Sequence, residues 1–208
     1  MPATAKICGL STPETLDAAV AGGASHVGFV FFPPSPRAVT PAQAAALSAR
    51  HAGGPRRVGL FVKPTDEQVS AALDALPLDV LQVYTDADRA AALRARFGVP
   101  VWLAVGVEGR ADLPDRAPGV DALMLDAKPP RDATLPGGNA HPFDWTVLRG
   151  WEAPLPWLLA GGLTPGNVAD AVRASGARAV DVSSGVERER GVKDAGLIRA
   201  FVRAAKGG

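Results

Sequence analysis

The feature that most constrains the fold of this chain is a regular alternation of two kinds of segment. Short apolar runs, many of them β-branched, are followed by longer stretches rich in Ala and Leu. The runs are too apolar for strands with one face in water, and they are typical of parallel strands covered on both faces. Eight strands are therefore expected, at residues 5–9, 26–31, 57–62, 79–84, 100–105, 121–126, 156–161 and 178–184.

The stretches between these runs carry helix signals. Segment 11–23 begins with a Ser or Thr N-cap candidate followed by Pro13 and closes with two glycines, and segment 40–54 repeats this pattern. The fifth connection, residues 106–119, is too rich in Pro and Gly for a helix to be predicted. Five more helices are expected, at 65–76, 85–98, 143–150, 164–176 and 193–205.

Eight strand–helix units with no compositional break predict one domain, residues 1–208, folded as a (β/α)₈ TIM barrel of eight parallel strands with outer helices. The length of 208 residues suits a compact barrel of this kind. An open, doubly wound parallel sheet is the alternative, because counting strands does not show whether a sheet closes. Eight repeats that end in a helix favour the closed barrel.

Composition excludes several classes of protein. The 22 basic and 21 acidic residues are interspersed and give a net charge of +1, so no nucleic-acid or anionic-membrane partner is expected. No apolar stretch approaches the roughly 20 residues of a membrane helix, and the N-terminal residues lack the pattern of a secretory signal. A single cysteine cannot form an internal disulfide. We therefore expect a cytoplasmic location.

The sequence also lacks the motifs of common cofactor sites. No G-x-G-x-x-G fingerprint follows the first run, and no G-x-x-x-x-G-K-[ST] phosphate loop is present. The three histidines, His26, His51 and His141, do not have metal-ligand spacing. Neither a metal nor an organic cofactor is expected.

Candidate catalytic residues fall where such a barrel places its active site, at the carboxyl ends of the strands. Cys8 ends the first predicted strand and Asp126 ends the sixth. Alone, a cysteine is more often a buried structural thiol, and an aspartate is often a turn residue. Facing one cavity, a thiol and a carboxyl can act as a base and acid pair, provided that their surroundings separate their pKa values.

Four other charged residues belong to the same analysis. Arg37 lies in the loop after the second strand, where it is either solvated or recognises a carboxylate. Asp181 is a candidate binding residue, because a carboxylate inside an apolar strand is costly to bury unless it is partnered or functional. Lys6 is placed near the bottom of the first strand or on its other face, and Lys128 follows Asp126; solvation is a sufficient explanation for both.

The last two strands are followed by loops of small residues. Gly161 and Gly162 allow the backbone to approach a ligand, and Ser183, Ser184 and Gly185 offer hydroxyl and amide hydrogens. Loops after strands 7 and 8 form the recurrent phosphate site of this fold. Two such loops in adjacent units indicate a phosphorylated small-molecule ligand, and ordinary turn chemistry is the alternative.

Six segments resemble, in order and spacing, the phosphoribosylanthranilate isomerase family of tryptophan biosynthesis, and together they span nearly the whole chain. Each piece alone has little specificity, whereas six in order are highly specific. The segments are "KICGL" (6–10), "GFVFFPPSPRAV" (28–39), "LMLDAK" (123–128), "GG…FDW" (137–145), "LAGGLTPGNV" (159–168) and "VDVSSGVERERGVKD" (180–194).

The resemblance implies an intramolecular Amadori rearrangement of N-(5-phosphoribosyl)anthranilate to the corresponding carboxyphenylamino deoxyribulose phosphate. It implies that Asp126 is the general acid, that Cys8 is the general base and that Arg37 binds the anthranilate carboxylate. The loops at 161–162 and 183–185 would hold the phosphate. The resemblance implies no metal or organic cofactor, because the substrate nitrogen serves as the electron sink.

Two positions depart from the family pattern. Tyr84, in "QVYT", stands where the family usually has histidine. Asn139 and Ala140 stand where the family usually has Thr and Gly before the Phe-Asp-Trp segment. Neither departure touches the acid or the base that the resemblance implies.

Three other functions remain open on the sequence. Another phosphosugar barrel isomerase, such as the related enzyme of histidine biosynthesis, is expected to use two aspartates, whereas the first strand here ends in Cys8. A catalytically silent phosphosugar-binding protein would not need Cys8 and Asp126. A redox-sensing thiol would need a resolving cysteine, which the chain lacks. The sequence does not decide between a monomer and a homodimer.

Overall fold

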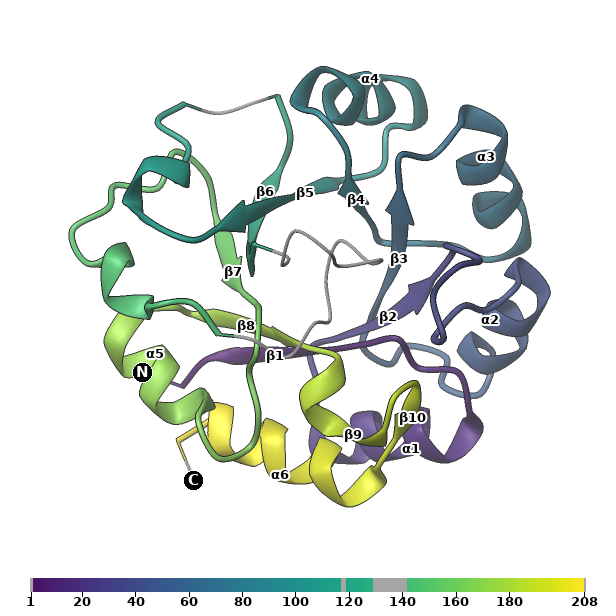
Figure 1. The fold of residues 1–208 in the computed structure, drawn as a ribbon. Coiled ribbons are helices and arrows are strands. Elements are labelled where there is room, and N and C mark those ends of the chain that lie inside the picture. The colour runs from purple at the N-terminus through teal and green to yellow at the C-terminus, as the bar shows by residue number, and fades with distance from the viewer. Residues whose placement is uncertain (1, 117–118, 129–141, 208) are drawn as a thin grey trace.

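A closed barrel of eight parallel strands forms the centre of the molecule (Figure 1). The computed structural model describes residues 2–116, 119–128 and 142–207. The first strand pairs with the second on one side and with the eighth on the other, which closes the sheet. The predicted barrel is therefore confirmed and the open sheet is wrong. The strands are β1 (Thr4–Cys8), β2 (His26–Val30), β3 (Arg56–Val62), β4 (Val80–Tyr84), β5 (Val101–Val107), β6 (Ala122–Ala127), β7 (Trp157–Leu159) and β8 (Ala179–Val182).

Helices surround the barrel, and local side chains define where they begin. Thr12 caps the first helix, and Thr40 and Thr65 form capping boxes with the glutamines three residues later. Within the described residues, no helix has the length and apolar character needed to cross a membrane. The helices are α1 (Pro13–Gly22), α2 (Pro41–Ser48), α3 (Asp66–Ala75), α4 (Ala87–Phe97), α5 (Val168–Ser175) and α6 (Ala195–Ala205).

The helix expected at 143–150 is wrong. This stretch forms only a short 3₁₀ helix, η2 (Trp145–Leu148), which Asp144 caps. It ends because Gly150 turns the backbone to a φ of +65° and two prolines follow within six residues. The fifth connection, where no helix was predicted, contains the 3₁₀ helix η1 (Arg110–Asp112).

Alternation along the strands sorts the apolar side chains into two layers. One layer fills the inside of the barrel and includes Val58, Trp102 and Met124. The larger layer, which includes Phe29 and Leu125, packs between the strands and the helices. Most residues of the inner layer come early in their strands, so the amino-terminal end of the barrel is plugged and the carboxyl-terminal end is left for a pocket.

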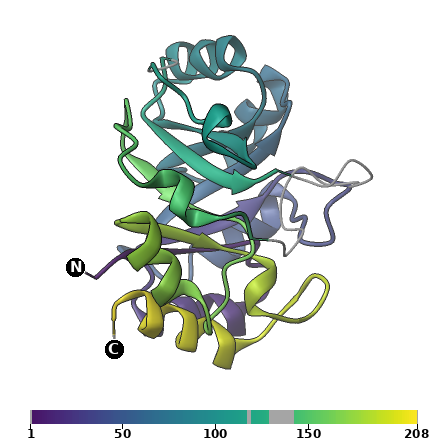
Figure 2. The same cartoon turned by 60° about the vertical axis from the view of Figure 1, so that its left-hand side comes forward.

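The chain after β8 returns to the barrel mouth before its last helix. It forms the 3₁₀ helix η3 (Ser184–Val186) and then a hairpin of β9 (Glu187–Glu189) and β10 (Val192–Lys193), which the sequence did not predict. Figure 2 shows this hairpin at the end of the barrel opposite to both chain termini. The final helix α6 then packs beside α1, outside the seam between β1 and β8.

Phe201 tests the importance of this packing. The side chain lies on α6 with 0% exposure in the layer between strands and helices. Phe201→Ala is expected to lower the free energy of unfolding by about 3–5 kcal/mol, because the cavity does not collapse fully. Arg199→Ala, on the exposed side of the same helix, is the matched control and should change it by less than about 0.5 kcal/mol. Urea denaturation measures both, and equal effects would contradict the prediction.

Candidate active site at the carboxyl ends of the strands

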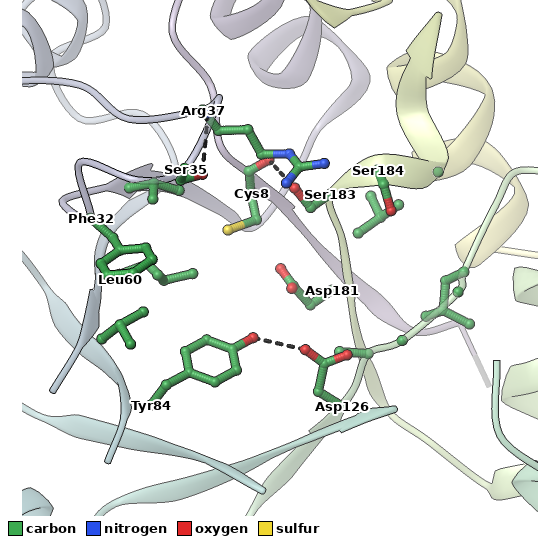
Figure 3. Close-up of a pocket in the computed structure, with 18 residues that line it drawn as sticks. Cys8, Phe32, Ser35, Arg37, Leu60, Tyr84, Asp126, Asp181, Ser183 and Ser184 are labelled. Carbon is green, nitrogen blue, oxygen red and sulfur yellow. Dashed lines mark hydrogen bonds between the residues drawn. The ribbon is translucent and has the colours of Figure 1, made fainter. Parts of the chain in front are cut away.

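A pocket opens at the carboxyl ends of the strands and encloses about 670 Å³, including its open mouth. Polar side chains from β1, β4, β6 and β8 converge on it (Figure 3). Every residue that the sequence predicted for the site lines this pocket: Cys8, Arg37, Asp126, Gly161, Gly162, Asp181, Ser183, Ser184 and Gly185.

The Cys8 side chain points from the end of β1 into the pocket (Figure 3). It is 2% exposed, and its carbonyl accepts a hydrogen bond of 3.3 Å from the Ser183 hydroxyl. Burial raises the pKa of the Cys8 thiol, while the ammonium groups of Lys6 and Lys193 oppose that rise. Cys8 is thus a protonated thiol at neutral pH, next to cations that favour its ionised form.

Lys6 lies inside the barrel, so its interpretation as a solvated residue is wrong. Residues two apart on a strand share a face, and Lys6 therefore faces inward with Cys8. Its side chain is 1% exposed and donates a 2.7 Å hydrogen bond to Asp181, its register partner on β8. Burial alone would lower the pKa of Lys6, but the Asp181 carboxylate and Cys8 together more than offset it and the pKa is raised. The carboxylate of Asp181 is partnered, as its burial requires.

Gly28 on β2 gives the thiol and the ammonium their space. A Cβ at this position would lie 3.1 Å from Cys8 Sγ and 3.2 Å from Lys6 Nζ. These two atoms therefore border the same small volume above Gly28. A larger residue here would press on both atoms, so glycine leaves the cation room beside the thiol.

Asp126 lies at the end of β6 and is 6% exposed. The hydroxyl of Tyr84, from the end of β4, donates a 2.8 Å hydrogen bond to its Oδ2 atom (Figure 3). Burial raises the pKa of Asp126 to about 6, with the Tyr84 hydrogen bond opposing and the charge of Asp181 adding to the rise. A carboxyl with such a pKa can give up a proton near neutrality.

Arg37 is buried at the mouth of the pocket rather than solvated. Its Nε and Nη2 atoms donate hydrogen bonds of 2.6 and 2.9 Å to the two carboxylate oxygens of Glu187 on β9. Lys193 on β10 donates to Glu187 at 2.7 Å and to the Ser183 carbonyl at 2.8 Å. Burial tends to raise the pKa of Glu187, but the hydrogen bonds and charges of Arg37 and Lys193 bring it down to about 2. Glu187 is therefore an anion that fixes the guanidinium in place.

The loops after β7 and β8 pack directly on their neighbours. Gly161 has a φ of +83°, and a Cβ there would lie 2.4 Å from the backbone nitrogen of Ala127. A Cβ on Gly185 would lie 1.8 Å from the carbonyl oxygen of Leu163, in the loop after β7. No other residue fits at either position. The two loops thus present backbone and the hydroxyls of Ser183 and Ser184 to one side of the pocket.

Sequence reasoning missed four residues that build this site. The strand period of two was a usable signal for Lys6, whereas the hairpin that supplies Glu187 and Lys193 had no signal of that kind. Tyr84 was recognised only as a departure from the family pattern.

Among the described residues, no group of three or more His, Cys, Asp or Glu side chains is placed to hold a metal ion. Asn139, Ala140 and His141 lie outside the described residues.

The fold and the pocket define a class of protein, a (β/α)₈ barrel with a thiol, carboxyls and a basic group gathered at its carboxyl-terminal mouth. The family model of N-(5'-phosphoribosyl)anthranilate isomerase matches residues 5–204. The chain therefore belongs to the N-(5'-phosphoribosyl)anthranilate isomerase family.

Individual relatives agree with this membership. The chain is 58% identical over 203 residues to the N-(5'-phosphoribosyl)anthranilate isomerase of Acidiphilium cryptum, with 98% of each chain covered. It is similar to the solved structure of phosphoribosyl anthranilate isomerase from Thermotoga maritima, with 32% identity, a TM-score of 0.86 and 99% and 100% of the two chains covered. A structure of such an isomerase in complex with reduced 1-(o-carboxyphenylamino)-1-deoxyribulose 5-phosphate is 31% identical, with a TM-score of 0.84 and the same coverage.

Lys6→Met tests the buried ion pair. The change leaves the Asp181 carboxylate buried without its cation, and it is expected to lower the free energy of unfolding by about 3–5 kcal/mol. The double variant Lys6→Met with Asp181→Asn should recover part of that loss, since no unpaired charge remains. Urea denaturation of the two variants measures the difference. A double variant that is less stable than Lys6→Met would contradict this account.

Asp126→Asn tests how much the burial of the Asp126 carboxylate lowers the free energy of unfolding. Because the pKa of Asp126 is raised to about 6 in the folded protein, the folded state binds more protons than the unfolded chain between pH ~4 and ~6, and stability falls as the pH rises through this window. The variant removes that loss and should be more stable than the natural protein by ~3 kcal/mol at neutral pH, with no difference below pH ~4. Urea denaturation at the two pH values measures it, with the exposed Asp115→Asn as control. A gain that does not depend on pH would refute the prediction.

Proposed function

We propose that this protein isomerises N-(5'-phosphoribosyl)anthranilate to 1-(o-carboxyphenylamino)-1-deoxyribulose 5-phosphate, with Asp126 as general acid and Cys8 as general base. The observation that carries the proposal is the convergence of these two groups on one pocket, beside a buried guanidinium, in a member of this isomerase family. The reaction moves protons within one molecule and consumes no other reactant.

In the first step Asp126 gives its proton to the ring oxygen of the ribose. The bond between C1 and this oxygen breaks, and the nitrogen lone pair forms the double bond of a protonated Schiff base. Asp126 suits this step because its pKa of about 6 leaves a usable acid form near neutrality.

In the second step Cys8 removes the proton on C2. The electron pair of that C–H bond forms the C1–C2 double bond and neutralises the nitrogen, giving an enolamine. The enol then loses its hydroxyl proton while C1 gains one, which yields the ketone. The cations near Cys8 stabilise its thiolate at the moment it is needed.

The reaction requires that Asp126 and Cys8 hold one proton between them. That proton must be on Asp126, and Cys8 must be ionised. The pKa of Asp126 is about 6 and that of the Cys8 thiol is raised above its ordinary value. At neutral pH the pair therefore holds one proton, the required number, although it resides mostly on sulfur. Below the lower pKa both groups carry a proton, and above the higher one neither does.

The substrate is an anion at both ends, and the pocket offers a partner for each. Glu187 occupies Nε and Nη2 of Arg37, so we assign the remaining Nη1 to the anthranilate carboxylate. We assign the phosphate to the loops that contain Gly161, Gly162 and residues 183–185. We also propose that Asp181, which lines the same pocket, contributes to substrate binding. The solved complex of a family member with reduced 1-(o-carboxyphenylamino)-1-deoxyribulose 5-phosphate supports a ligand that carries both a carboxylate and a phosphate.

A reducing compartment suits this chemistry, because a base that acts as a thiolate is lost on oxidation. We therefore also propose a cytoplasmic location.

The proposed function predicts how activity depends on the two groups. The purified protein is expected to consume N-(5'-phosphoribosyl)anthranilate with loss of its anthranilate fluorescence. Cys8→Ala and Asp126→Asn should each lower kcat/KM by ~10²–10⁴, and Arg199→Ala, far from the pocket, serves as control. The pH profile of the natural protein should be bell-shaped, with its acidic limb near pH 6 set by Asp126.

Each result has a distinct meaning. An inactive natural protein would refute the isomerase function. Full activity in Cys8→Ala or in Asp126→Asn would refute the role of that residue and leave the function standing.

A further inference from the structure

We propose that Tyr84 is a positioning residue for Asp126, whose hydroxyl fixes one carboxylate oxygen so that the other faces the substrate. This inference deepens the proposed function, because it rests on Asp126 acting as the acid. The tyrosine takes part through Asp126 and does not itself exchange protons with the substrate.

The first support is the path by which Tyr84 reaches Asp126. The two residues end β4 and β6, which are separated by β5. On β5, Ala104 packs against the same inner apolar layer as Tyr84. The phenol reaches across β5 and donates to Asp126 Oδ2 at 2.8 Å. A small inward side chain on the strand between them is compatible with this contact.

The second support is the fixed position of the donor. The tyrosine ring lines the pocket together with Leu60 and with its own register partner on β3, Val62, and the tyrosine hydroxyl is aimed at Asp126 (Figure 3). Carboxyl groups rotate easily about their last side-chain torsion, which has broad minima. A hydrogen bond from an anchored ring removes this freedom. Since Oδ2 is engaged, the transferable proton of Asp126 resides on Oδ1.

The third support is that the phenol can only donate. Burial raises the pKa of Tyr84 well above its ordinary value, and the Asp126 carboxylate adds to the rise. Tyr84 therefore keeps its proton at every pH at which the reaction runs. A permanent donor stabilises the ionised form of Asp126, which lowers the pKa of that carboxyl against the effect of burial.

Other groups around the pocket also act on the pKa of Asp126. The charge of Asp181 on β8 raises the pKa of Asp126, whereas Lys6 on β1 and the Ala127 amide lower it. The Tyr84 hydroxyl donates directly to the carboxylate at 2.8 Å, and it can be removed by deleting one atom. The remaining titratable groups at the pocket are Cys8 and Arg37, with Lys193 and Glu187 behind them.

Tyr84→Phe is the central test, because it keeps the ring and deletes the hydroxyl. The pKa of Asp126 should rise by about one unit, since one hydrogen bond to the ionised form is lost. Carbon-13 NMR of the aspartate carboxyl carbons follows this titration, with the Asp126→Asn spectrum providing the assignment. The acidic limb of kcat/KM should move to higher pH by the same amount. The value of kcat should fall roughly 10-fold to 100-fold with KM unchanged, because positioning rather than binding is lost.

A second test uses the fact that Tyr84 is the chain's single tyrosine. The ultraviolet absorbance of the phenolate therefore reports this residue alone. Asp126→Asn should bring the pKa of Tyr84 down toward the ordinary value of about 10, since the neighbouring carboxylate is gone. Both shifts report on the same contact between Tyr84 and Asp126.

Two controls separate positioning from general structural effects. Ser25→Ala deletes a partly buried hydroxyl at the amino-terminal start of β2, and it should leave the Asp126 titration and the acidic limb unchanged. In the Asp126→Asn background, Tyr84→Phe should cause no further loss of kcat, because it has nothing left to position.

The outcomes decide between the inference and its alternatives. An Asp126 titration that is identical in Tyr84→Phe and the natural protein would overturn the contact. A shifted titration with unchanged kcat and an unmoved acidic limb would overturn the positioning role. Full activity of Asp126→Asn would instead show that the proposed function of Asp126 fails, while the NMR and absorbance titrations would still decide whether Tyr84 and Asp126 are coupled.

Discussion

The pairing of the first strand with the last is the constraint on which the rest of the structure depends. It converts a sheet into a barrel, and it carries a buried ion pair, Lys6 with Asp181, across the seam. An ion pair in this place stabilises little in itself, because desolvation offsets most of the attraction. Its effect is on register, since a slip of one residue would point both charges at the apolar outer layer.

The same seam organises the site chemistry. β1 supplies Cys8 one layer above Lys6, and β8 leads into the serines and the hairpin that anchors Arg37. Asp126 lies across the pocket on β6, where burial and a single phenol hydrogen bond act against each other. The thiol and the carboxyl therefore experience different surroundings. Burial raises the pKa of both groups. Lys6 and Lys193 oppose this rise at Cys8, and the Tyr84 hydroxyl opposes it at Asp126.

Much of the fold could be predicted from the sequence, because strands buried on both faces leave a clear apolar pattern. Cys8 and Asp126 could be placed at the mouth for the same reason, since each ends such a run. The charge of Lys6 favours a solvated position, whereas the strand period puts it on the same inward face as Cys8; its buried partner Asp181 makes the inward position possible. The contacts of Arg37 with Glu187 and of Tyr84 with Asp126 join residues 150 and 42 positions apart. No local pattern encodes such pairs, and only the closed barrel brings them together.

The hairpin after β8 has a consequence for how the protein comes into being. Glu187 is one of the last parts of the site to leave the ribosome, yet it fixes an arginine made 150 residues earlier. Lys6 likewise remains without its partner until β8 is synthesised. A partly made chain thus has no neutralised barrel interior and no anchored guanidinium, whatever local structure it has gained. The mouth of the barrel is completed at the end of translation, and a chain truncated before the hairpin would lack the anchor of its own arginine.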